Sequence, residues 1–348
     1  MDDSVNARML IIDDTSQVRT SNGDMFTSNY MIGRIALNVI LMESIGDNEN
    51  WTTPQEDLTI AEIVQGTDFL IQKAEEKSVN LSWVYEIHRE VPTIYEPIQG
   101  KSVPYYEEFP ELHWEFRWIN HALSHLGYSR DKWDGCFDMA NDVRQRYYAD
   151  WGYSVFVVMD ETDTTGTIHR FTDGYFAYVP SYYNPLPFFG AYDNQCFVVM
   201  TYNNDDYGPF NMDKIFRHET AHIFRAADEY YDPGYGGCEE DDCGNNHGYL
   251  QVPNGNCERC NPDPVECIMY NKPYTHNVIC DYTLGHLGWQ DTDGDGPADP
   301  IDPNDGSGWL SIPDVDLGDI IRIASVGQQF QNVFTVTSSN SFLAASGR

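Results

Sequence analysis

Apolar residues recur along the first two thirds of the chain with two different periods. Short runs rich in β-branched residues are typical of buried strands, and we expect strands at residues 33–42, 81–87, 153–159 and 196–202. Apolar positions three and four residues apart are typical of amphipathic helices, and we expect helices at residues 53–77, 108–126, 133–151 and 211–224. The order is strand, helix, strand, then helices, then further strands, which predicts a domain that mixes both kinds of element.

The pattern changes in three later segments. Residues 175–183 are aromatic and β-prone, but Pro180 cannot donate to a strand ladder, so we expect an edge strand or an irregular loop there. Residues 228–289 are rich in Gly, Pro, Asn and Cys and have little periodicity, which favours an irregular subdomain. Past Trp309 the pattern becomes β-like again, and we interpret residues 307–348 as the start of a small β-module.

Composition and charge narrow the class of protein. The chain has 348 residues, of which 41% are hydrophobic and 14% aromatic, enough to fold into one large domain or two ordinary ones. Its formal net charge of −35 repels phosphate backbones and anionic lipid, so we expect no nucleic acid partner and no binding to a membrane surface. The charge fits solubility or a salty medium, and it fits calcium binding equally well.

The cysteines indicate an oxidising compartment. Six of the eight lie close together in the sequence, at Cys238, Cys243, Cys257, Cys260, Cys267 and Cys280. Such a cluster in a loop-rich segment is typical of disulfides. The alternative is a structural zinc site built from Cys257, Cys260, Cys267 and Cys280. Since no apolar run of membrane-spanning length is present, we expect a secreted or cell-surface protein whose signal peptide is absent from this chain.

The stretch from His218 to His222 carries the strongest chemical pattern, His-Glu-x-x-His. At helical spacing both imidazoles project from one face and can share a zinc ion, while Glu219 can activate water. A catalytic zinc usually takes a third protein ligand. Glu229 would lie about 16 Å along a continued helix, whereas Asp228 can reach the metal if the chain turns back.

A family resemblance follows from this spacing. The run His218-Glu219-x-x-His222-x-x-Arg225-x-x-Asp228 resembles the extended signature of the metzincin zinc endopeptidases, whose third ligand is Asp in the snapalysin-like group. The run Cys267-Ile268-Met269-Tyr270 resembles their Met-turn, a tight turn beneath the metal. The resemblance implies an α+β zincin with a mixed twisted sheet, helices above the cleft and a disulfide-rich lower subdomain.

The same resemblance implies the roles of the site residues. His218, His222 and Asp228 would hold a catalytic zinc, and Glu219 would be the general base. Two departures from the family pattern stand out. Arg225 occupies a position that is usually glycine, where a residue at positive φ costs about 1 kcal/mol. The tyrosine that assists the metal in some metzincins is replaced by Asn271, which leaves Tyr270 and Tyr274 as possible transition-state stabilisers.

A second metal site is predicted after the cysteine-rich segment. The oxygen-ligand spacing of a calcium loop, with Gly296 at its sixth position, is reproduced by Asp291, Asp293, Asp295, Asp299 and Asp302. Prolines exclude flanking EF-hand helices, so the loop resembles those of thrombospondin type 3 or dockerin-like repeats. The alternative is an acidic linker without fixed metal. Calcium here would be structural.

These observations support one leading function and two alternatives. We expect a monomeric, zinc-dependent endopeptidase that binds a polypeptide extended along the edge strand at residues 175–183. The alternatives are a non-catalytic, metal-stabilised surface or adhesion protein, and a zinc hydrolase of small amides or esters. The expected parts are an N-terminal extension (1–32), a catalytic domain (33–289, with its lower part from 225), a calcium loop (290–306) and the β-module.

Overall fold

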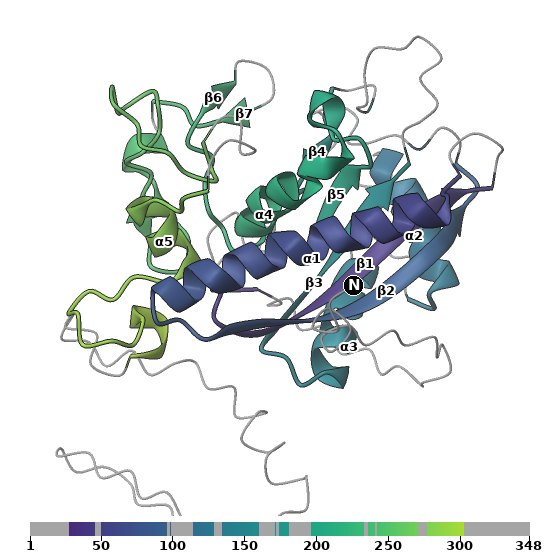
Figure 1. Ribbon diagram of the computed structural model, residues 1–348, viewed down its shortest axis with the longest axis horizontal. Coiled ribbons are helices and arrows are strands. Elements are labelled where there is room, and N and C mark those ends of the chain that lie inside the picture. The colour runs from purple at the N-terminus through teal and green to yellow at the C-terminus, as the bar shows by residue number, and fades with distance from the viewer. Residues whose placement is uncertain are drawn as a thin grey trace, which may run out of the picture.

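A five-stranded sheet with helices on both faces forms the body of the protein (Figure 1). The computed structural model describes residues 28–45, 50–95, 98, 114–128, 134–159, 171, 174–180, 196–232, 236–240, 242–270 and 277–302. The expected β-module at residues 307–348 lies outside the described residues. Among the described residues, no helix has the length and apolar character needed to cross a membrane.

The sheet is mainly parallel and has the order β2-β1-β3-β5-β4. Its strands are β1 (Gly33–Ser44), β2 (Leu81–Thr93), β3 (Trp151–Val158), β4 (Ala177–Tyr178) and β5 (Phe197–Thr201). Strands β2, β1, β3 and β5 run parallel, and β4 pairs antiparallel with β5 at the edge. The four expected strands and the edge strand are confirmed, and β2 continues six residues past the predicted end at residue 87.

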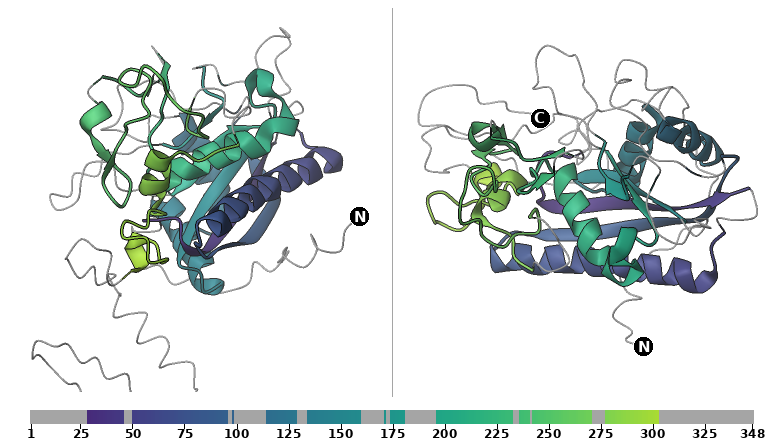
Figure 2. Two further views of the ribbon diagram at one scale, coloured as in Figure 1. Left: turned by 60° about the vertical axis from the view of Figure 1, so that its left-hand side comes forward. Right: turned by 90° about the horizontal axis from the view of Figure 1, so that it is seen from above.

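Helices cover the two faces of the sheet in pairs, α1 with α4 and α2 with α3 (Figure 2). They are α1 (Thr53–Glu76), α2 (Trp114–His125), α3 (Asp134–Arg146) and α4 (Met212–Ile223). Alternation along β1 explains this, because successive side chains of a strand point to opposite faces. Val39 and Leu41 pack in the cluster with α1 and α4, whereas Ile40 and Met42 pack in the cluster with α2 and α3.

The junction between α1 and α4 is close and partly polar. A Cβ atom at Gly66 would lie 2.7 Å from the Asp213 carbonyl oxygen, so the approach of the two helices requires glycine. Asp213 lies within the first turn of α4, whose N-cap is Asn211. The Asp213 N–H donates to Glu62 Oε2 of α1 at 3.3 Å. Helix α1 therefore helps to fix the start of α4.

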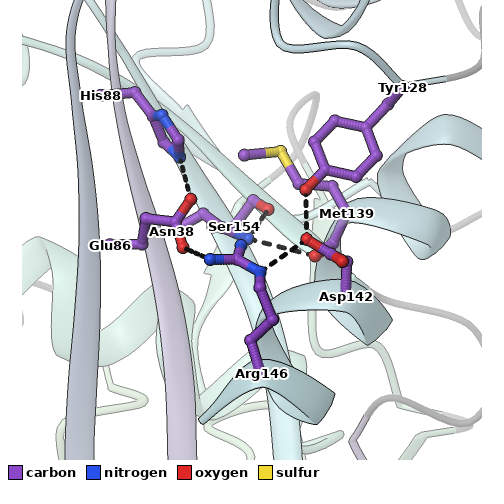
Figure 3. A network of polar contacts seen from close by, with 8 residues as sticks. All are labelled: Asn38, Glu86, His88, Tyr128, Met139, Asp142, Arg146 and Ser154. Atoms are coloured by element: carbon purple, nitrogen blue, oxygen red, sulfur yellow. Dashed lines mark hydrogen bonds and ion pairs between the residues drawn. The ribbon is translucent and has the colours of Figure 1, made fainter. Parts of the chain in front are cut away.

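On the opposite face, an ion-pair network joins β2 to α3 (Figure 3). Arg146 pairs with the buried Glu86 and donates through Nε to Asp142 at 2.8 Å. His88 lies 3.2 Å from the other oxygen of Glu86. Burial alone would raise the pKa of Glu86, but the hydrogen bonds from His88 and Arg146 outweigh it and lower the pKa to about 2. Glu86 is therefore a buried carboxylate that stays ionised.

Past α4 the chain has little regular structure. Its elements are β6 (Tyr231–Asp232), β7 (Gly236–Gly237), β8 (Asn246–His247), β9 (Val252–Pro253) and α5 (Asp281–Leu287). Short 3-10 helices occupy Asp205–Tyr207, Pro209–Asn211, Asp242–Gly244 and Asp299–Ile301. Residues 28–32 pack against this part, since Met31 N donates to Leu287 O at 2.9 Å and Trp289 Nε1 donates to Met31 O at 2.6 Å.

Two disulfides cross-link this lower part, Cys238–Cys257 and Cys243–Cys260. The prediction of disulfides in the cysteine cluster is thus confirmed for these four residues. The alternative four-cysteine zinc site is wrong, because Cys257 and Cys260 each bond to another cysteine. Buried thiols remain at Cys136, Cys196, Cys267 and Cys280.

Candidate metal centre

Helix α4 presents His218 and His222 side by side. Their ring centroids are 4.8 Å apart and the ring planes are nearly perpendicular, at 89°. The helix itself is held firmly, since most of its residues are buried and Thr220 Oγ1 lies 3.0 Å from Tyr153 Oη of β3. The two imidazoles are therefore placed by the helical spacing and by the packing of α4 on the sheet.

Backbone carbonyls orient both rings. His218 Nδ1 lies 2.8 Å from Ile268 O, and His222 Nδ1 lies 2.8 Å from Ala226 O. A carbonyl oxygen only accepts, so each Nδ1 must carry the proton. When a ring is neutral, its Nε2 atom then carries the free lone pair. This is the arrangement in which histidines ligate a metal through Nε2.

Asp228 completes a three-atom convergence. Its Oδ1 lies 3.2 Å from His218 Nε2 and 3.3 Å from His222 Nε2. Two ligands at about 2.0–2.1 Å from a tetrahedral zinc ion are themselves about 3.3 Å apart. Asp228 Oδ1 is buried and accepts no hydrogen bond from the described residues. Both carboxylate–imidazole separations thus match those of a shared zinc ion, and all three ligand atoms lie within 4.8 Å of one another, so the residues fit that metal.

The electrostatics of the three residues also favour a cation between them. Burial disfavours a charged imidazole, but the negative charge of Asp228 outweighs it and raises the pKa of His222 to about 9. Burial alone would raise the pKa of Asp228, but the two histidines hold it well below its usual range. The group accordingly stabilises positive charge at its centre.

The chain reaches Asp228 through a left-handed turn at Arg225. Arg225 has φ of 67°, so this non-glycine residue adopts the left-handed conformation that the family pattern usually gives to glycine. The turn is a Schellman motif: Ala226 N donates to Ala221 O at 3.0 Å, and Arg225 N donates to His222 O at 2.8 Å. The guanidinium donates to Asn29 Oδ1 at 3.2 Å. The bend that brings Asp228 back is therefore made without glycine.

The turn at Cys267–Tyr270 contacts both sides of the centre. Tyr270 N donates to Cys267 O at 3.1 Å, which closes the turn, and Met269 at its tip is fully buried. Ile268 supplies the carbonyl that orients His218. Met269 O accepts from Glu229 N at 2.9 Å, next to Asp228. This segment therefore supports a helix ligand and the loop ligand together.

Glu229 is a buried anchor of the lower part. Its Oε2 accepts from Asn256 Nδ2 at 2.6 Å, and its Oε1 accepts from Thr283 Oγ1 at 2.9 Å and from Cys280 Sγ at 2.8 Å. Its carboxylate is bound to these residues of the lower part, which agrees with the expectation that Glu229 is not a zinc ligand. Sequence reasoning missed this role, because its partners lie 27 to 54 residues further along the chain.

Glu219 occupies the position expected of a base. It is buried beside the two histidines, and burial raises its pKa, against the lowering effect of His218 and His222. A carboxylate whose pKa is raised towards neutrality is better able to accept and return a proton. The arrangement can therefore support acid–base chemistry next to a metal.

The tyrosines are arranged differently from the prediction. Tyr270 Oη donates to Glu258 Oε2 at 3.0 Å and is held by that bond, and Tyr274 lies outside the described residues. Tyr230 lies nearer to the centre, with its ring centroid 6.3 Å from that of His218. The charge of Asp228, burial and the charge of Glu219 all raise its pKa, so it stays a neutral donor. Its position in the sequence, two residues past the predicted ligand Asp228, could have identified Tyr230 as the tyrosine near the centre.

The acidic loop gathers part of its predicted ligands. Asp291, Asp293 and Asp295 have carboxylate oxygens within 4.8 Å of one another. Both oxygens of Asp291 also accept backbone bonds, from Gly294 N at 2.8 Å and Gly296 N at 3.0 Å.

The two remaining aspartates differ. Desolvation, and then the charges of Asp293, Asp302 and Asp291, raise the pKa of the exposed Asp295, so Asp302 lies within electrostatic range of it. Asp299 instead accepts from Thr292 N and Thr292 Oγ1, both at 2.7 Å. Three of the five predicted ligands are thus brought together, Asp302 acts on them through its charge, and Asp299 braces the loop.

Comparison with known proteins does not place the chain in a family. No protein-family model matches it, and no curated protein matches it significantly. A proposal for its function therefore rests on the geometry of its own residues.

Proposed function

We propose that this protein is a secreted, zinc-dependent endopeptidase of metzincin-like architecture. The observation that carries the proposal is the convergence of three ligand atoms. Asp228 Oδ1 lies 3.2 Å from His218 Nε2 and 3.3 Å from His222 Nε2, and it accepts no hydrogen bond from the described residues. Two imidazoles and one carboxylate leave a fourth position of a tetrahedral ion open, which is typical of a catalytic rather than a structural zinc site.

The chemistry follows from the positions of the side chains. Zinc, when bound at these three residues, supplies Lewis-acid activation of water and of a peptide carbonyl. Glu219 accepts the proton that leaves the attacking water and passes it to the departing amine. Tyr230 donates a hydrogen bond to the oxygen on which negative charge develops. The carbonyls of Ile268 and Ala226 keep both imidazoles in the ligating tautomer.

Substrate binding is proposed at the edge of the sheet. Strand β4 is the last strand in the sheet order, and it packs against α4, which carries the histidines. An extended polypeptide can pair with the outer main-chain groups of such a strand. This arrangement suits a polypeptide better than a small amide or ester, because a strand edge pairs with main-chain groups that flank the cleaved bond.

Calcium is proposed at the loop of residues 291–302, where the acidic side chains gather. It would be structural, because the imidazole pair belongs to a different cluster of ligands, with Asp228. The two disulfides support an exported protein. We propose that the protein works as a monomer, since one chain supplies all three zinc ligands.

The test is a casein-cleavage assay of the purified chain with and without a zinc chelator. Glu219→Gln keeps the size of the side chain and removes the base, so cleavage should fall at least about 100-fold while bound zinc is unchanged. Glu75→Gln, on the exposed side of α1, is the matched control and should leave cleavage at the wild-type rate. Equal cleavage by the wild type and Glu219→Gln would reject the mechanism. Bound zinc with no cleavage by the wild type would favour the non-catalytic surface or adhesion protein.

A further inference from the structure

Two buried thiols lie together beside the turn at Cys267–Tyr270. The sulfur atoms of Cys267 and Cys280 are within 4.8 Å of each other, and Cys280 N donates to Cys267 Sγ at 3.3 Å. Both sulfurs also lie near Thr283 Oγ1, at 3.2 Å for Cys267 and 3.6 Å for Cys280. Neither cysteine is disulfide-bonded in the structure, and both side chains are buried.

We infer that Cys267 and Cys280 form a third disulfide in the exported protein. The step is thiol–disulfide exchange: the two thiols lose two protons and two electrons, and an S–S bond forms between them. The oxidant is a small-molecule disulfide or the disulfide of an oxidoreductase, whose S–S bond breaks to give two thiols. The segment between Cys238 and Cys260 already carries two disulfides, so the same oxidising conditions reach this part of the chain.

A metal at the same place is the competing interpretation, because Glu229 lies within 4.8 Å of both sulfurs. The hydrogen bonds of Glu229 favour the disulfide. Asn256 donates to one of its oxygens and Thr283 to the other, so the carboxylate stays satisfied when the Cys280 thiol, which also donates to it at 2.8 Å, is oxidised. Cys257 and Cys260, the other soft ligands nearby in the sequence, are bonded elsewhere. Two thiols alone form an incomplete zinc site.

The position of this cross-link gives it a function. Cys267 directly precedes Ile268, whose carbonyl oxygen orients His218. Cys280 is the N-cap of α5, and its sulfur accepts from Thr283 N at 3.5 Å. Helix α5 lies beside the C-terminal end of α4 (Figures 1 and 2). The disulfide would therefore fasten the turn to α5 and keep the carbonyl in place for His218.

Peptide mapping without reduction tests the bond directly. The protein is prepared so that the Cys238–Cys257 peptide pair is linked, then denatured, treated with iodoacetamide and digested. We expect Cys267 and Cys280 in one linked peptide pair that separates only after reduction. Alkylation of both cysteines in the unreduced sample would overturn the inference. This result is independent of zinc and activity, so it is distinguishable from failure of the proposed function.

A double variant tests the effect on the metal centre, and this part rests on the proposed function. Cys267→Ser with Cys280→Ser should retain one zinc per chain but bind it about 10-fold more weakly, the effect expected when support of a ligand is loosened. Wild-type zinc affinity in the double variant would overturn the proposed fastening. Two zinc ions in the wild type and one in the variant would show a metal site in place of the disulfide.

Discussion

The layered sheet and the irregular lower part hold their residues by different means. In the sheet, alternating apolar side chains pack against paired helices, and regular backbone hydrogen bonds set every position. In the part after α4, strands are only two residues long and two disulfides cross-link the loops. The buried side chains of Asn254 and Asn256 donate to backbone carbonyls there, and the buried Glu229 accepts from other side chains. In periodic structure the local sequence pattern is enough to place a residue, whereas in irregular structure its position depends on specific partners far away in the sequence.

The candidate metal centre lies where these two parts meet. The sheet side contributes His218 and His222 through a helix whose spacing is inherent in the sequence. The lower side contributes Asp228 and the carbonyl of Ile268 through bonds that depend on the whole loop arrangement. A change on the lower side should therefore affect metal binding without unfolding the sheet, whereas a change in the sheet should lower the stability of the whole domain.

The largest expected effect comes from removing the ligand of the lower part. Asp228→Ala should reduce zinc affinity by more than about 100-fold, beyond the range expected for an outer partner of a ligand, and should abolish cleavage. Asp263→Ala, an exposed aspartate of the same part, is the control and should bind zinc normally. The measurement is zinc content at limiting zinc. Unchanged content in Asp228→Ala would exclude it as a ligand.

A change on the sheet side, Glu86→Gln, removes the ion pair between Glu86 and Arg146. The folded pKa of Glu86, about 2, lies below its ordinary value of 4.5, so the unfolded state binds more protons between these values. Its contribution to stability, about 3 kcal/mol, should be present above pH 4.5 and lost as the pH falls towards 2.

Urea unfolding of the wild type and Glu86→Gln at neutral pH and near pH 2.5 measures this contribution. The stability difference between the two proteins should be largest at neutral pH and should shrink in acid. Glu75→Gln serves as the exposed control and should show no such dependence. A wild-type advantage of equal size at both pH values would contradict the proposed role of the buried carboxylate.

A pair of tyrosine variants separates the two sides within the site. Tyr230→Phe should lower kcat about 100-fold, the scale of a lost hydrogen bond to a developing oxyanion, with little change in zinc content. Tyr270→Phe should leave kcat close to that of the wild type, since its hydroxyl already donates to Glu258. Steady-state kinetics on a fluorogenic peptide provide the values. If Tyr270→Phe proved the more damaging variant, the original assignment to Tyr270 would stand instead.

The smallest expected effect concerns the bend between the two parts. Arg225→Gly relieves the strain of a left-handed residue but removes the bond to Asn29, so the free energy of unfolding should change by less than about 1 kcal/mol. Arg225→Val should be less stable than Arg225→Gly by at least about 1 kcal/mol, because β-branched residues tolerate positive φ poorly. Thermal unfolding of both variants ranks them. Equal stability would show that the turn relaxes when it is substituted.

The same contrast explains what the sequence could predict. The strands and helices of the sheet follow from local apolar periodicity, and their order was predicted. The predicted ends were wrong for β2, which is six residues longer, and for α3, which ends at Arg146 instead of residue 151. The convergence of Asp228 with the histidines was expected from spacing. The sequence did not predict three features: the position of Tyr230, the anchoring of Glu229, and the pair of Cys267 and Cys280. These depend on contacts between loops that have no periodic pattern of their own.

Zinc-edge X-ray absorption of the purified chain, loaded with one equivalent of zinc, tests the central claim most directly. The account predicts a first shell of nitrogen and oxygen atoms only, at about 2.0–2.1 Å, with the outer scattering of two imidazole rings. Asp228→Ala should lose one of the short oxygen contributions. Sulfur scattering at about 2.3 Å, or a first shell without imidazole, would contradict it and would place the zinc at the cysteines or elsewhere.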